Sequence, residues 1–199
     1  VVSEKQPNGE MRDIQTQSVA VGDGLDYEKT ACNPVLTQKD LPEGYSKFDF
    51  RDPKIWREAD GTYSAVTVAL TEDGSGAAVL FQSKDGFDWH FVTVLARNNN
   101  VYGKMWECPD FFPLDGKHVL MVGPMEMRPS GEFHNGHNVI AFVGSYDEKT
   151  HTFTREQVQL VDGGIDFYAT QTTQAPDGRR LMTAWLQTWS DTEDKPQGC

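Results

Sequence analysis

Apolar residues recur along the chain in short runs, which are broken at intervals by Asp-Gly and other glycine-containing turns. The runs are rich in Val, Thr and aromatic residues, which favour strands, and no segment of useful length shows the 3.6-residue period of an amphipathic helix. The pattern therefore predicts an all-β chain. Two blocks of four strands are expected, at 48–56, 62–70, 77–83 and 87–95, and at 109–114, 117–122, 138–144 and 152–160.

Weaker patterns flank these two blocks. Residues 1–10 are polar and contain Pro7-Asn8-Gly9, so we expect a turn or a loose end there. Strands at 14–21 and 25–29, separated by a glycine-rich turn, predict a hairpin. A third block is expected to begin at 166–170 and to continue through 181–189.

The blocks form an internal repeat. An acidic residue stands near the start of each one (Asp52, Glu107 and Asp166), and the intervals between them are about 55 to 60 residues. Four-stranded units at a spacing of this order are typical of β-propeller blades with antiparallel strands. A β-sandwich is the competing fold, but it does not require a carboxylate at the same place in every repeat. We therefore predict that residues 1–199 form a single partial propeller domain of about three blades.

A propeller would bring these carboxylates together, because the first strand of each blade lines the central channel. Carboxylates that converge in one pocket are suited to acid and base roles, since like charges held close favour different protonation states. Aromatic residues are expected to rim that pocket and to stack on a sugar ring: Trp56, Trp106, Tyr168 and Trp189. For each aromatic, packing between blades is the alternative. Asp52 could likewise be a turn residue before Pro53, with Arg51 as its surface ion partner.

The stretch 105–110 gives the sharpest chemical signal. Glu107 stands between Trp106 and Cys108, followed by Pro109, and more aromatic residues come directly after. Apolar surroundings would favour the protonated form of a carboxyl group, so Glu107 is a candidate proton donor. The alternative is a Glu at the start of a strand, held by backbone N–H groups.

The composition narrows the class of protein. The 199 residues carry 18 Lys and Arg against 30 Asp and Glu, for a net charge of −12, which argues against nucleic acid and anionic membranes as partners. No apolar run is long enough to span a bilayer. The three cysteines suggest neither a disulfide framework nor a zinc site. We expect no cofactor and no metal, and we expect a cytoplasmic protein, with a secreted one as the alternative.

Two further groups have an alternative chemical reading. His134 and His137, with Glu132 nearby, could together bind a metal ion. The loop is glycine-rich, however, so a solvated loop or a loop at the site rim is favoured. Cys108 could be a reactive thiol, although a small residue that tunes Glu107 is the favoured role.

Three stretches resemble successive motifs of glycoside hydrolase family 32, the β-fructofuranosidase family of invertases, sucrose-6-phosphate hydrolases, inulinases and levanases. They are Phe50-Arg51-Asp52-Pro53, Trp106-Glu107-Cys108-Pro109-Asp110 and Asp166-Phe167-Tyr168-Ala169, supported by Asn33-Pro34-Val35 and by 184–189. The resemblance runs from about Gln15 to the C-terminus. It implies a five-bladed propeller with the active site at the mouth of its channel, usually followed by a β-sandwich, which is expected to be absent from these 199 residues.

The resemblance also implies roles for individual residues. Glu107 would be the acid/base of a retaining mechanism that releases fructose from sucrose, sucrose 6-phosphate or fructans. Asp52 would bind hydroxyls of the fructosyl ring and stabilise the transition state, with Arg51 assisting. The other implied substrate-binding residues are Asp166, Tyr168, Trp189 and Trp106.

The sequence departs from the family pattern in one respect. The nucleophile of the family is the Asp of a Trp-Met-Asn-Asp-Pro-Asn-Gly motif, and Gln6 stands where that Asp would precede Pro7-Asn8-Gly9. We therefore expect a fragment that does not hydrolyse sucrose alone and that can associate through open blade edges. A fructosyltransferase on the same scaffold and a non-catalytic sugar-binding propeller remain the alternatives.

Overall fold

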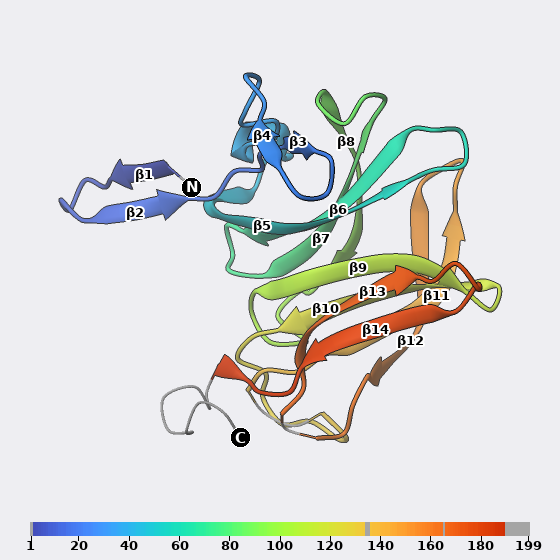
Figure 1. Ribbon diagram of the computed structural model, residues 1–199. Helices are drawn as coiled ribbons and strands as arrows, with labels where there is room; N and C mark the ends of the chain where they lie inside the picture. Colours follow the sequence, from blue (N-terminus) through green and yellow to red (C-terminus); the bar gives the residue numbers. More distant parts are fainter. Residues whose placement is uncertain (1, 134–135, 165, 190–199) are drawn as a thin grey trace.

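The computed structural model describes residues 2–133, 136–164 and 166–189, and its largest elements are two four-stranded antiparallel sheets (Figure 1). In each sheet the strands follow one another in chain order, so every connection is a hairpin or a longer loop between neighbours. The first sheet contains β5 (Tyr45–Arg57), β6 (Tyr63–Thr71), β7 (Gly76–Ser83) and β8 (Trp89–Arg97). The second contains β9 (Trp106–Leu114), β10 (Lys117–Pro124), β11 (Ile140–Asp147) and β12 (Thr152–Leu160). The two predicted blocks are confirmed.

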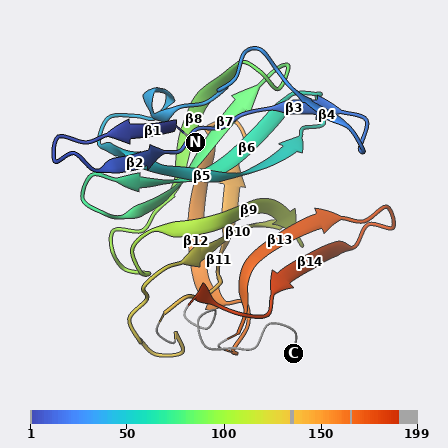
Figure 2. The same cartoon turned by 60° about the vertical axis from the view of Figure 1, so that its left-hand side comes forward.

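A third unit begins with the hairpin of β13 (Tyr168–Gln174) and β14 (Arg180–Trp185). In two views this hairpin lies beside the β9–β12 sheet, and β13 contacts both β9 and β10 (Figures 1 and 2). The predicted strand at 166–170 therefore starts two residues later than expected, and the predicted 181–189 strand ends at Trp185.

The N-terminal prediction was wrong in part. Residues 1–10 were expected to be a turn or a loose end, but β1 (Val2–Lys5) pairs with β2 (Met11–Ile14). The Asn8 side chain closes the turn by accepting a hydrogen bond from the Glu10 amide at 3.1 Å. Of the predicted 14–21 strand, Ile14 ends β2 and only residues 20 and 21 lie in β3 (Ala20–Gly22), which pairs with β4 (Tyr27–Lys29). A 3₁₀-helix, η1 (Gln38–Asp40), precedes the first sheet.

Burial on both faces explains why the sequences of the central strands are continuous apolar runs. Both faces of β6 and β7 are buried, and successive side chains alternate between two apolar clusters. Val66 belongs to the cluster between the two sheets, together with Trp106, whereas its neighbour Ala65 faces a cluster with Phe50 and Phe81. Each buried phenylalanine of this kind stabilises the fold by about 1.5–3 kcal/mol. Within the described residues we find no helix with the length and apolar character needed to cross a bilayer.

Candidate active site

The first strands of the three units carry the same β-bulge. Across each bulge the first strand advances three residues while its partner advances only two. A non-glycine residue with positive φ lies inside each bulge. The bulges run from Arg51 to Lys54, from Glu107 to Asp110 and from Tyr168 to Gln171. The residues with positive φ are Asp52 (59°), Cys108 (48°) and Ala169 (53°).

This register corrects the predicted equivalence of the acidic residues. Arg51, Glu107 and Tyr168 occupy the same place, immediately before the residue with positive φ, and their side chains meet. Asp52 is one position further along its strand. Asp166 is half-buried and lies two residues before Tyr168, so the shared bulge does not place it in this ring. Three carboxylates were expected at equivalent positions, and the structure has a cation, a carboxylate and a phenol instead.

The Glu107 carboxylate is the centre of this ring. Its Oε1 accepts a hydrogen bond from Arg51 Nη2 at 3.0 Å, and its Oε2 accepts one from the Tyr168 hydroxyl at 2.8 Å and one from Trp189 Nε1 at 3.3 Å. The side chain is 14% exposed. The immediate surroundings of the carboxylate are therefore polar, which corrects the apolar setting expected from the residues next to it in sequence.

Arg51 connects the two predicted catalytic carboxylates. Its Nε lies 3.9 Å from Asp52 Oδ2, and its Nη1 donates to Asp49 at 3.0 Å. Burial by itself would lower the pKa of Arg51, but the charges of Glu107 and Asp52 and the hydrogen bonds outweigh it, so the pKa is raised. Arg51 therefore stays a cation, and Asp52 and Glu107 lie within reach of one guanidinium group.

Asp52 is tied to the next blade through the backbone. Its Oδ2 accepts a hydrogen bond from the Cys108 amide at 3.0 Å, and the side chain remains 33% exposed. The carboxylate is thus fixed in direction while still open to a ligand. A turn Asp with a surface ion partner would not make this contact with a neighbouring blade.

Two weak acids beside Glu107 keep their protons. Burial, followed by the charges of Asp52 and Glu107, raises the pKa of the Cys108 thiol to about 12. Burial and the charge of Glu107 also raise the pKa of Tyr168 well above its usual range. Cys108 is therefore a neutral thiol at physiological pH, against the reading as a reactive nucleophile, and Tyr168 is a permanent hydrogen-bond donor.

The predicted aromatic rim is largely wrong. Trp106 is fully buried in the core and its Nε1 donates to the Tyr102 carbonyl, so it cannot stack on a sugar. Tyr168 is also buried, and it offers its hydroxyl to Glu107 instead of a ring face to a ligand. Trp189 is 53% exposed and packs edge-on against Trp185, so its predicted place on the rim stays a prediction.

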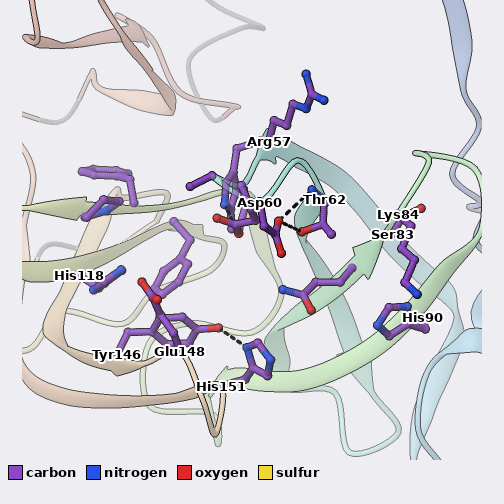
Figure 3. A pocket seen from close by; sticks show the side chains of 17 residues that line it. Arg57, Asp60, Thr62, Ser83, Lys84, His90, His118, Tyr146, Glu148 and His151 are labelled. Carbon is purple, nitrogen blue, oxygen red and sulfur yellow. Dashed lines mark hydrogen bonds between the residues drawn. The ribbon is translucent and has the colours of Figure 1, made fainter.

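Trp56 lies at the opposite end of β5, where its Nε1 donates to Glu58 at 2.7 Å. It lines a cleft of about 780 Å³ between the two sheets, together with His118, Tyr146 and His151 (Figure 3). The Tyr146 hydroxyl and His151 Nδ1 are 2.9 Å apart there. The lining of this cleft on β9 begins at Phe111, roughly 13 Å along the strand from Glu107, and includes none of Arg51, Glu107 and Tyr168, so it is separate from the ring around that carboxylate.

Several contacts of the ring were not predicted. Gln15 Oε1 accepts hydrogen bonds from the Phe50 amide at 3.1 Å and from Arg51 Nη1 at 3.4 Å, and Met125 Sδ lies 3.7 Å from Arg51 Nη2. Asp49 could have been found from its place two residues before Arg51. Gln15 and Met125 come from segments outside the motifs, and nothing in their sequence surroundings marks them.

The predicted metal alternative involves His134, which lies outside the described residues. In the described ranges, no group of three or more His, Cys, Asp or Glu side chains is arranged to hold a metal ion.

Comparison with known proteins decides the family. The sequence model of the Glycosyl hydrolases family 32 N-terminal domain matches residues 2–198. The chain belongs to glycoside hydrolase family 32. Sucrose-6-phosphate hydrolase of Bacillus subtilis (strain 168) is 40% identical over 176 residues, which cover 85% of this chain and 35% of that protein. Raffinose invertase of Escherichia coli is 37% identical over 180 residues, which cover 90% of this chain and 36% of that protein.

Solved structures of the family agree. The GH32 β-fructofuranosidase of Bombyx mori has a TM-score of 0.83 at 33% identity, over 98% of this chain and 40% of that one. A mutant of the same protein was solved in complex with sucrose. The all-β fold, as part of a propeller with four-stranded antiparallel blades, is confirmed. The chain spans only 35% to 40% of the length of these relatives.

Proposed function

We propose that the protein containing this chain is a β-fructofuranosidase, a glycoside hydrolase that releases fructose from sucrose, sucrose 6-phosphate or fructans. The observation that carries the proposal is the ring in which Arg51 and Tyr168 both donate hydrogen bonds to the Glu107 carboxylate, with Asp52 beside them. The names of the relatives support the same substrate class.

In this proposal Glu107 is the acid/base of a retaining mechanism. It protonates the glycosidic oxygen as a second carboxylate, which the ring around Glu107 does not include, bonds to the anomeric carbon and the glycosidic bond breaks. It later removes a proton from the water that displaces this second carboxylate. The three donors around Glu107 can each hydrogen-bond the carboxylate that remains after the first proton transfer. Their fixed directions also keep its oxygens in place between the two steps.

Asp52 and Arg51 are assigned to the fructosyl unit. The Asp52 carboxylate, held by the Cys108 amide and one-third exposed, suits a pair of sugar hydroxyls and the positive charge that develops on the ring. Trp189 offers an exposed indole at the same mouth. Asp166 is proposed as a further substrate-binding residue on the resemblance of its motif. Tyr168 is assigned to Glu107 and not to the sugar.

The experiment compares the intact protein with its Glu107→Gln variant. Glutamine keeps the shape and the acceptor oxygen but cannot transfer a proton, so turnover should fall about 10²- to 10⁴-fold while the fold is retained. Sucrose, sucrose 6-phosphate and raffinose are assayed for free fructose, and transfer products are analysed to separate hydrolysis from fructosyl transfer. Glu72→Gln, at an exposed turn, is the matched control. Undiminished turnover in Glu107→Gln would refute the assignment.

We also propose that the protein works in the cytoplasm. Cys32 and Cys108, the two cysteines among the described residues, are free thiols, and free thiols persist in reducing compartments. Fractionation of cells that produce the intact protein, followed by an activity assay of each fraction, tests this assignment.

A further inference from the structure

A second layer of polar side chains lies just beyond the three bulges. Lys54, Asp110 and Gln171 are the residues that end the bulges of the three first strands. They connect neighbouring strands: Lys54 Nζ lies 3.7 Å from Asp110 Oδ2, and Gln171 Nε2 donates to the carbonyls of Cys108 and Pro109 at 3.3 and 3.2 Å.

Asp110 is the centre of this layer. It is 1% exposed, and its Oδ2 accepts hydrogen bonds from the Thr172 amide at 2.6 Å and from the Thr172 hydroxyl at 2.7 Å. Lys54 also donates to the Thr172 carbonyl, at 2.5 Å. The backbone of Thr172 is therefore held on both sides by side chains from the two preceding blades. A buried carboxylate is unfavourable unless it is paired and hydrogen-bonded, and here it is both.

These contacts help to hold β13 in place. β13 pairs only with β14 in the described sheets, so no ladder of backbone hydrogen bonds connects it to β9. Its position depends on side-chain contacts, and the buried ones among the described residues join Thr172 to Asp110 of β9 and the Tyr168 hydroxyl to the Gly123 carbonyl of β10, the latter at 3.1 Å. Tyr168 is on the same strand, on the other side of the bulge, and must place its hydroxyl 2.8 Å from Glu107.

We propose that Asp110 is a positioning residue for the acid/base. Through Thr172, and with Lys54 as its counter-ion, its carboxylate holds β13 so that the Tyr168 hydroxyl meets Glu107. The inference rests on the proposed function, in which Glu107 transfers the proton. Asp110 stands three residues from Glu107 on β9, and its side chain contacts the next blade instead of the ring around Glu107.

A double-mutant cycle in the intact protein tests this role. Asp110→Asn keeps the shape but removes the charge that faces Lys54, so turnover on sucrose should fall about 10- to 100-fold, with little change in KM, because Tyr168 is displaced. Tyr168→Phe should produce a similar loss. If Asp110 acts through Tyr168, the double variant should be no slower than the slower single variant. Losses that multiply in the double variant would overturn the proposal, as would wild-type turnover in Asp110→Asn.

A second pair of variants covers the case in which Asp110→Asn does not fold. Thr172→Val keeps the amide but removes the hydroxyl, which donates to Asp110 and accepts from Arg180 Nη1, and it should also lower turnover. Thr172→Ser restores the hydroxyl and should restore turnover. Equal turnover in these two variants would contradict the proposal. Asp115→Asn, at the exposed turn after β9, is the control for the chemical change.

Hydrogen exchange separates this proposal from the proposed function. Peptides that cover Tyr168–Gln174 should exchange faster in Asp110→Asn than in Asp115→Asn, whether or not the protein hydrolyses fructosides. If the wild-type protein releases no fructose, the proposed function fails, and the exchange rates still decide whether Asp110 holds β13. Unchanged exchange in β13 would overturn the inference.

Discussion

At the scale of single residues, the ring around Glu107 combines one group that changes protonation during the proposed reaction with neighbours that do not. Arg51 stays charged because the nearby carboxylates outweigh the effect of burial on its pKa. Tyr168 stays protonated because burial and the charge of Glu107 raise its pKa. The donors to Glu107 are therefore constant over the physiological pH range. Only the carboxyl group itself has to gain and lose a proton.

The thiol next to Glu107 should be inert, which is the prediction at this scale. Because burial and the two carboxylates raise the pKa of Cys108 to about 12, it carries almost no thiolate below pH 9. Iodoacetamide at pH 8, followed by peptide mass spectrometry, should label the exposed Cys32 and leave Cys108 unmodified in the folded protein. Denatured protein, in which both residues react, is the control. Rapid labelling of Cys108 in the folded state would contradict the assignment.

At the scale of elements, the shared β-bulge is what brings side chains of three first strands together at the site. A strand presents alternate residues to one face, and an extra residue with positive φ changes that direction locally. The bulge turns Asp52 and Cys108 so that the carboxylate of one meets the amide of the other. The short Arg-Asp-Pro and Glu-Cys-Pro motifs are therefore bulge sequences, whatever part they take in the proposed reaction.

Substitution at the third bulge should reveal its backbone strain. Ala169 has a φ of 53°, a region that glycine enters freely and β-branched residues resist. We expect Ala169→Val to lower the free energy of unfolding by about 1–3 kcal/mol. Ala169→Gly should be neutral or stabilising within about 1 kcal/mol, and urea denaturation measures both.

The same change in an extended strand gives the matched control. Ala20 is exposed on β3, and Ala20→Gly should destabilise by about 0.5–1 kcal/mol, because a glycine there loses more conformational freedom on folding. The contrast in sign between the two glycine variants is the decisive quantity. Equal losses at Ala169 and Ala20 would argue against strain at the bulge.

The strands were predictable from the sequence to a greater extent than the site. Asp-Gly turns and apolar runs mark β5 to β12, because local propensity and burial agree there. The site depends on strand register, which a count of acidic residues does not reveal. Relative to its own bulge, Asp52 lies one residue later in its strand than Glu107 does in the next. Trp106 shows the same limit, because the alternation of the strand turns the residue before Glu107 into the core.

At the scale of the whole molecule, the last hairpin leaves apolar surface uncovered. Beside it, the outer face of the β9–β12 sheet forms an apolar cleft of about 370 Å³ that includes Val119, Val143 and Met182. On β14 and just beyond it, Leu181 and Met182 are each 45% exposed and Leu186 is 71% exposed. Met182 lines the cleft, whereas its neighbour Leu181 points to the other face of β14. Exposed apolar side chains on both faces of this hairpin favour contact with another surface.

We therefore expect the 199-residue chain, produced alone, to self-associate through the β13–β14 side. Among the described residues β14 pairs only with β13, so it forms a sheet edge there, and both features favour contact between copies. Size-exclusion chromatography with light scattering should give masses above 22.3 kDa that rise with concentration in the micromolar to millimolar range. Replacing Leu181 and Met182 together by Glu should shift the population to monomer. Thr183→Glu adds charge to the same strand without removing apolar surface and should do so much less; a wild-type chain that stays monomeric throughout the range would rule the prediction out.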